Sequence, residues 1–301
     1  MATNSLAQNT ESNHYQHLEE KYEILKDSVA SLHPLIPAVS SVIIRYHQLE
    51  INFFNSLITT NRFRDNNGDL KSLNARETYF YNTLQLTYGI SKKDNFNIGI
   101  DLNSAMGRID QDINSSVFKV FNSTVQGNSK YARAVTSIST RVRWRPFKKI
   151  YNFTVQASAN FPTNLSPSRQ IVLGPNRIYL ITQLLYNQPL SKRLFLFSQL
   201  SFQYGFSNKD VQPISYLPVS TYLSYLLPKK TILFALANYV PIFSKQNSRN
   251  YIYTFQLGGG FQYQISQKLL INLYYSNDIS GKNYGDFNSY NLSLRFLTKR
   301  H

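Results

Sequence analysis

Cysteine is absent from the 301 residues of this chain. Without cysteine there are no disulfides, no thiol chemistry and no thiolate metal sites. Long apolar runs are absent too: the mean hydropathy is −0.32, and no stretch approaches the roughly 18–20 apolar residues that a spanning helix needs. These absences argue against a helical membrane protein. They still allow a membrane protein built from strands, because a spanning strand needs only about 9–11 residues and one apolar face.

Acidic residues are also scarce. The chain has 16 Asp and Glu against 32 Lys and Arg, which gives a formal net charge of +16. The pI is about 9.8. Basic proteins of this kind often bind nucleic acid or the anionic surface of a membrane. The positions of the basic residues along the chain are what distinguish these two partners.

Alternation of apolar and polar residues is the dominant pattern after residue 48. For example, Phe255 and Leu257 flank Gln256 in a stretch that continues in the same way on both sides. A period of two predicts β-strands with one apolar and one polar face. We predict about twelve strands, near residues 48–59, 76–90, 95–106, 131–145, 150–161, 177–190, 193–206, 217–227, 231–241, 250–265, 268–278 and 287–298.

The connections between these strands alternate in length. The short ones are "SKKDN", "PFKKI", "SKR", "PKK" and "SQK". Because every second connection is tight, we expect consecutive hairpins in an up-and-down meander, with all the tight turns at one end. The long connections lie around residues 60–75, 107–130, 162–176, 207–216, 242–249 and 279–286.

The number and length of the strands predict which face of the sheet contacts lipid and which contacts water. With the apolar face inside, about eight strands already give a filled barrel, so twelve would enclose too much space. We therefore predict an all-β fold: a closed up-and-down antiparallel transmembrane β-barrel of about 12 strands, with its polar face lining the lumen and its apolar face in lipid. A soluble β-sandwich or lipocalin-like protein is the alternative, although sandwich strands are typically shorter, at about 5–6 residues.

The last strand, "YNLSLRF", alternates in the same way and ends on Phe296. Three features of the chain from residue 48 to 298 resemble bacterial outer-membrane β-barrel proteins. They are this last strand, the even number of strands and the tyrosine-rich strand ends. It departs from them at the very end, where "LTKRH" follows the terminal aromatic residue. The resemblance implies a location in the outer membrane, contact with its lipid, and periplasmic tight turns and termini. It does not identify a subfamily.

The region before the barrel has a different pattern, so we divide the chain into residues 1–47 and 48–301. Residues 1–13 form a polar tail, in which Ser5–Gln8 is either the remnant of a removed export signal or ordinary tail. A periplasmic amphipathic helix follows, which packs against its own domain or docks on another outer-membrane or periplasmic protein. Its apolar stripe consists of Tyr15, Leu18, Tyr22, Leu25, Val29 and Leu32.

The basic residues concentrate in the tight turns. This regular placement predicts a rim around one end of the barrel, where lysines attract lipid phosphates, rather than the groove or helix face of a nucleic-acid-binding protein. We therefore expect no nucleic-acid partner. The predicted periplasmic rim contains Lys92, Lys93, Lys148, Lys149, Lys192, Arg193, Lys229, Lys230 and Lys268.

Charged residues also occur on the polar face and therefore in the predicted lumen. Either the acids and arginines pair and fill the lumen, or the arginines form a ladder that favours anionic solutes. Arg177 and Arg295 lie near the rims and Arg145 lies close to a turn. The predicted lumen charge cluster is Glu50, Glu77, Asp101, Arg133, Arg141 and Arg143.

Glycines Gly258–Gly260 stand in strand register and no helix follows them, so they predict a bend or a close backbone approach rather than a phosphate loop. None of the five histidines falls inside the predicted wall, so a catalytic triad cannot be built in the lumen. His14 and His17 share a helix face with Glu20, for which a solvated face is the simpler interpretation than a metal site. We expect no cofactor.

Two functions remain open at this point. The first is a non-enzymatic passive channel for small polar or anionic solutes. The second is a non-transporting barrel subunit or scaffold of a multiprotein outer-membrane assembly. An open lumen lined by arginine would favour the channel, and a plugged lumen would favour the subunit.

Overall fold

The fold is given by a computed structural model that describes residues 43–147, 149–207, 212–244 and 252–298. The predicted N-terminal tail and amphipathic helix, and Lys148 of the predicted rim, lie outside the described residues. Among the residues described, none of the helices has the length and hydrophobicity that crossing a membrane requires.

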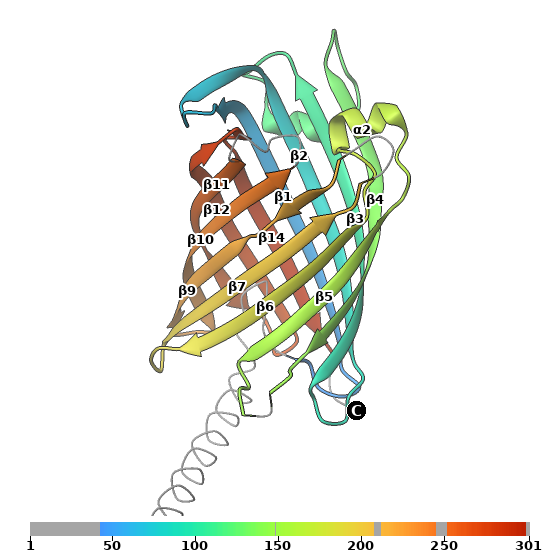
Figure 1. Cartoon of the computed structure of the whole chain (residues 1–301). Helices are drawn as coiled ribbons and strands as arrows, with labels where there is room; N and C mark the ends of the chain where they lie inside the picture. The colour runs from blue at the N-terminus through green and yellow to red at the C-terminus, as the bar shows by residue number, and fades with distance from the viewer. Residues whose placement is uncertain (1–42, 148, 208–211, 245–251, 299–301) are drawn as a thin grey trace, which may run out of the picture. The chain divides into compact units, whose positions relative to one another are not determined.

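The described residues contain a single antiparallel sheet of fourteen strands, twelve of them long (Figure 1). Successive strands are neighbours, so the predicted meander of hairpins is confirmed. The long strands are β1 (Leu49–Arg64), β2 (Leu70–Gly89), β3 (Phe96–Asp110), β4 (Lys130–Trp144), β5 (Phe153–Pro162), β6 (Tyr179–Pro189), β7 (Leu194–Gly205), β9 (Val219–Leu227), β10 (Thr231–Ser244), β11 (Ile252–Gln264), β12 (Leu269–Lys282) and β14 (Asn288–Leu297).

The sheet closes on itself, which confirms the predicted barrel. The last strand, β14, pairs with β1 from Glu50 opposite Leu297 to Thr59 opposite Asn288. All the other long strands pair with a neighbour on each side. Closure leaves no strand edge unpaired, which is the condition for a sheet to exist in lipid.

Two short strands account for the excess over twelve. β8 (Ile214–Tyr216) pairs with the same two strands as β9, so β8 and β9 are one strand interrupted at Leu217 and Pro218. Proline has no N–H to donate to the ladder, which favours an interruption there. In the same way β13 (Tyr284–Gly285) and β14 both pair with β1, on either side of a break.

Two of the predicted long loops are wrong. Residues 60–75 belong mostly to β1 and β2, which are joined by a turn at 65–69. Residues 279–286 likewise continue β12 and form β13. Both segments are mostly polar and do not alternate, and alternation was the sequence signal for a strand. Beyond the lipid both faces meet water, so the pairing continues where the alternation stops.

The two faces of the barrel differ as predicted. Apolar side chains on the outer face are exposed, for example Ile100 at 56% and Leu257 at 43%. Their neighbours in sequence, Asp101 and Gln256, have the opposite parity and point inward. The wall therefore has an apolar exterior and a largely polar interior, which is the arrangement that a bilayer requires.

One long connection folds into the lumen. Helix α2 (Pro167–Leu173) follows β5 and precedes β6 along the chain, and it contacts β3 and β4 (Figure 1). Gly107 has the inward parity of β3, and a Cβ atom on it would lie 2.6 Å from Cγ1 of Val172. Glycine at this position thus allows α2 to approach the inner wall. The 3-10 helix η1 (Val117–Phe121) packs instead on the outer side, where Phe121 contacts Phe80.

Candidate solute pathway in the barrel lumen

Five charged side chains point inward close to the end of the barrel that carries the tight turns. Glu50 and Arg295 come from β1 and β14, which close the barrel. Asp101 comes from β3, and Arg141 and Arg143 come from β4. All five are buried. Strand pairing places them on neighbouring strands, because β14, β1, β2, β3 and β4 follow one another around the wall.

Within this charge cluster the acids and arginines are paired. Nε of Arg295 donates to Oε2 of Glu50 at 2.6 Å, and a second guanidinium nitrogen contacts the same oxygen. Nη2 of Arg141 lies 3.1 Å from Oδ1 of Asp101. Arg143 lies within electrostatic reach of both carboxylates. Pairing is what retains charges in a confined space. The cluster nevertheless holds three guanidinium groups against two carboxylates.

A chain of amides extends the cluster around the wall. Both Nε and Nη2 of Arg143 donate to Oε1 of Gln156 on β5, at 2.9 and 2.8 Å. The amide of Gln156 donates to Gln183 on β6. Ser201 on β7 accepts hydrogen bonds from Gln183 at 3.3 Å and from Gln199 at 2.8 Å. We call the charge cluster and these amides the polar belt, and it runs from β14 to β7.

Arg133, which the sequence placed in the lumen cluster, points outward, so that prediction is wrong. The pairing of β3 with β4 shifts register between Asn103 and Ser104, where Thr136 is an extra residue on β4. Beyond such a bulge every side chain changes face. Arg133 therefore pairs with outward-facing Met106, and it is exposed.

Three other predicted positions lie away from the cluster. Glu77 points inward but near the long-loop end, where it accepts a hydrogen bond from the Tyr79 hydroxyl at 3.0 Å. Arg145 follows β4 in a tight turn, and its Nη2 donates to the carbonyl oxygen of Asp94 at 2.9 Å. Arg177 precedes β6 at the long-loop end and donates to a carbonyl of the next long loop at 2.7 Å.

The remaining part of the inner wall carries a row of rings that the sequence reasoning missed. Phe197 on β7 pairs with Tyr222 on β9, and Phe234 on β10 and Tyr274 on β12 stand on either side of Gly260 on β11. Their ring centroids are 5.8, 6.0 and 5.9 Å apart in that order, within the usual range for interacting aromatics. We call these four residues the aromatic arc. The available signal was the run "ILFALA" in β10, which is apolar at both parities.

The glycines of β11 lie beside this arc, and the predicted close backbone approach is present. Gly258 and Gly260 point inward. A Cβ atom on Gly258 would lie 2.7 Å from Cβ of Ser276, and one on Gly260 would lie 2.6 Å from Cα of Tyr274. Glycine here allows β12 to lie close and leaves space for the rings.

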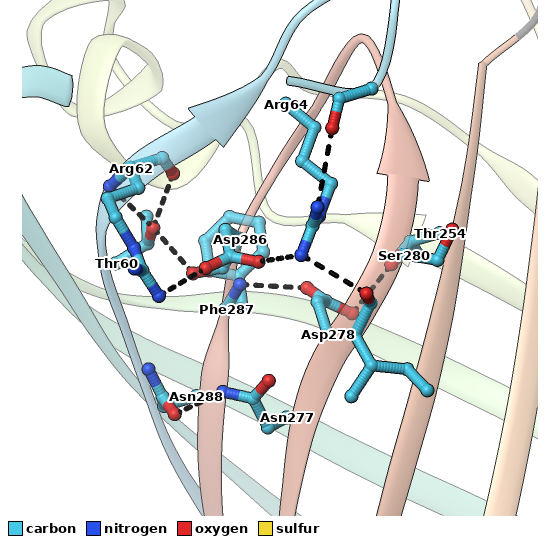
Figure 2. A network of polar contacts seen from close by, with 12 residues as sticks. Thr60, Arg62, Arg64, Thr254, Asn277, Asp278, Ser280, Asp286, Phe287 and Asn288 are labelled. Atoms are coloured by element: carbon cyan, nitrogen blue, oxygen red, sulfur yellow. Dashed lines mark hydrogen bonds and ion pairs between the residues drawn. The ribbon is translucent and has the colours of Figure 1, made fainter. Parts of the chain in front are cut away.

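A second polar network closes the wall at the long-loop end (Figure 2). Asp286 stands at the break between β13 and β14, and its side chain is 1% exposed. Its carboxylate accepts a hydrogen bond from Arg62 at 2.7 Å and lies 3.1 Å from Nη2 of Arg64, both on β1. The N–H of Phe287 donates to the carboxylate of Asp278 on β12 at 2.8 Å. These contacts replace the ladder hydrogen bonds that the break removes.

The predicted basic rim has its described members in the tight turns, and all of them are exposed. They lie at the same end of the barrel as the charge cluster. No group of three or more His, Asp or Glu side chains that could hold a metal occurs within the described residues. The described rim residues are Lys92, Lys93, Lys149, Lys192, Arg193, Lys229, Lys230 and Lys268.

Closure of the sheet, the tilt of its strands in Figure 1 and an apolar exterior define the chain as a bacterial outer-membrane β-barrel protein, and solved structures support this class. An outer-membrane channel from Pseudomonas putida F1 matches with a TM-score of 0.66 at 12% identity, covering 86% of this chain and 98% of that one. The β domain of the Bordetella autotransporter Brka matches with a TM-score of 0.53 at 10% identity, covering 83% and 99%. At this identity the likeness shows the fold alone.

The sequence itself matches one family over most of the barrel. Residues 60–296 match the family described as "Putative MetA-pathway of phenol degradation", and the chain belongs to this family. No curated protein matches the chain significantly.

Proposed function

We propose that the protein is a non-enzymatic passive channel for small polar or anionic solutes. The observation that carries this proposal is the polar lumen inside a closed wall. Tyr81 on β2 points inward and is 38% exposed, so the middle of the lumen admits water. A wall that separates lipid from a polar interior allows polar solutes to cross without entering hydrocarbon.

The polar belt supports a preference for anions. Its three guanidinium groups exceed its two carboxylates, and all five groups converge at one level of the lumen. A ring with net positive charge lowers the free energy of an anion in the passage and raises that of a cation. Arg141 is the residue whose charge is best placed for a test, because its ion pair with Asp101 faces the lumen.

The aromatic arc adds a second surface to the same lumen through the half-buried rings of Tyr222 and Tyr274. Rings offer planar apolar faces that polar groups cannot, so the lumen suits small solutes that combine a ring with a polar group. The family description, which names a phenol degradation pathway, agrees with such solutes. The matched Pseudomonas structure is itself an outer-membrane channel.

We also propose that the tight turns face the periplasm. The exposed rim of lysine and arginine supports this orientation, because cationic side chains at that level can contact the phosphates of the inner leaflet. The long loops, including α2, then face the exterior.

The test is single-channel conductance in a planar bilayer, comparing wild type with Arg141→Gln. We expect stable conductance steps with anion preference, and we expect Arg141→Gln to lose that preference because Asp101 is left without its guanidinium partner. Arg133→Gln is the matched control: it removes the same charge from the same strand but on the outer face, and should leave selectivity unchanged. A folded, heat-modifiable barrel that never conducts would contradict the channel.

The alternative, a non-transporting subunit of an outer-membrane assembly, is not favoured by any observation on the described barrel. An enzymatic role has no support there either. His47 precedes β1, outside the wall, with its Nδ1 2.7 Å from the Tyr88 hydroxyl. The described part of the lumen therefore contains no histidine that could act as a general base.

A further inference from the structure

The solvent exposure of the inward side chains changes along a single strand. On β2 the inward residue Tyr81 is 38% exposed, whereas the inward residue Thr87, whose hydroxyl accepts a hydrogen bond from Arg141 at 2.8 Å, is 2% exposed. Opposite the end of β2, inward Asn97 on β3 is 0% exposed. The passage is therefore accessible in its middle and filled at the tight-turn end.

The backbone at Ile44 and Arg45, just before β1, lies against the inner wall at that end. The side chain of Asn97 holds Ile44 at two points: its Oδ1 accepts from the backbone N–H of Ile44 at 3.0 Å, and its Nδ2 donates to the Ile44 carbonyl at 2.9 Å. Oδ1 of Asp94 accepts from the N–H of Tyr46 at 2.7 Å. Both anchors belong to the hairpin of β2 and β3.

The glycine at the end of β2 fits this contact. Gly89 pairs with Asn97 and shares its inward parity. A Cβ atom on Gly89 would overlap the carbonyl oxygen of Arg45 and lie 2.7 Å from its carbonyl carbon. The backbone at Ile44 and Arg45 thus occupies the space that any larger side chain at position 89 would fill.

Apolar side chains also occur on the inner face at this end. Leu185 on β6, Ile232 on β10 and Leu270 on β12 have inward parity and lie next to the tight turns. All three are buried, as are Ile43 and Ile44. Apolar residues on a water-facing wall are stable when an apolar segment covers them.

We propose that residues 43–46 are a gate that closes the tight-turn mouth of the channel. The gate swings on residues 47–48, which continue the β1–β2 ladder: the N–H of His47 donates to the Gly89 carbonyl at 2.9 Å, and the N–H of Gly89 donates to the Gln48 carbonyl at 3.0 Å. This inference rests on the proposed channel function. The segment is held to the wall chiefly through the β2–β3 hairpin, by hydrogen bonds that water can replace. Downstream it is fixed by β1, where Leu49 N–H donates to the Thr298 hydroxyl at 2.9 Å. Release of the Asn97 clamp would free the gate without opening the wall.

The first test compares channel conductance of wild type, Asn97→Leu and Gly89→Ala in planar bilayers. Asn97→Leu removes both clamp hydrogen bonds, and Gly89→Ala places a methyl group where the Arg45 carbonyl lies. We expect both variants to conduct severalfold more than wild type, or to open far more often. Asn103→Leu is the matched control, since Asn103 is also inward on β3 but bonds Ser137 and Ser139 instead, at 3.0 and 3.2 Å.

The second test does not depend on conductance. Because the chain has no cysteine, Ile44→Cys introduces a single thiol whose labelling by a water-soluble maleimide reports access to position 44. Ile44 is 3% exposed, so labelling of the folded barrel should be slow, and Asn97→Leu should accelerate it severalfold. A heat-modifiability gel shows for each variant that the barrel is folded.

The outcomes separate the gate from the channel. If wild type conducts and both gate variants match it, with equal labelling rates at position 44, the gate is wrong and the channel stands. If wild type and both gate variants are folded and silent, the channel function fails and the gate fails with it. Faster labelling and larger conductance in both variants, with the Asn103→Leu control unchanged, support the gate.

Discussion

The inner wall is built by two different kinds of chemistry. From β14 through β1 to β7 it is the polar belt, in which charges and amides pair in sequence. From β7 to β12 it is the aromatic arc, in which rings contact one another at about 6 Å. Hydrogen-bonded charges are directional, and each needs its partner, whereas rings tolerate small shifts. The comparison implies that the belt fixes the closure of the barrel more strictly than the arc does.

The largest effect is expected from breaking the pair that joins the first and last strands. Glu50→Leu leaves the Arg295 guanidinium buried without its carboxylate, which should destabilise the barrel by about 3–5 kcal/mol. Unfolding in urea, followed by the fluorescence of the single tryptophan, Trp144, measures it. The double variant with Arg295→Leu should recover most of the loss, because no unpaired charge remains. Equal losses in the single and double variants would show that packing, rather than charge, is decisive.

The matching break in the arc is Phe234→Ala. Phe234 is 6% exposed and contacts the rings of Tyr222 and Tyr274, so its removal leaves a cavity. We expect a loss of about 3 kcal/mol, at the low end for phenylalanine because one side of the arc faces the lumen. Leu233→Ala, the next residue on the lipid face, should cost much less. A similar loss for both would remove the distinction between the two faces of β10.

The smallest loss of stability is expected from substituting the inward glycine Gly260 of β11. Gly260→Ala adds a methyl group against Tyr274 and should cost about 1–3 kcal/mol through overpacking. Gly259→Ala is the control, since its added methyl points outward, 3.0 Å from the carbonyl oxygen of Phe234, and should cost less. Urea titration of both variants compares them directly. An equal cost for the two would mean that backbone freedom, and not the inner close approach, explains these glycines.

Much of the architecture could be predicted from local pattern. Strand number, hairpin order and the direction of the apolar face all follow from alternation, which reports a half-lipid, half-water environment residue by residue. The same reasoning failed where that environment ends. The outer parts of β1 and β2 are surrounded by water, so they pair without alternating, and their sequence is typical of a loop.

The candidate site was predicted in part. Glu50, Asp101, Arg141 and Arg143 point inward, as their parity indicates, and the structure brings them together with Arg295. Arg133 could not be placed, because one extra residue at Thr136 reverses the parity beyond it, and a bulge has no distinct composition. The aromatic arc was missed because rings at an inward parity contradict the simple rule that the inner face is polar.

The sequence by itself determined that this chain forms a wall with one face for lipid and one for water, because a period of two acts locally on each strand. Only the tertiary structure decided which side chains meet across that wall. The pairing of Glu50 with Arg295, 245 positions apart, depends on closure of the barrel. The contact of Ile44 with Asn97 depends on where the chain enters the barrel. Such contacts are set by register and closure, which no local pattern records.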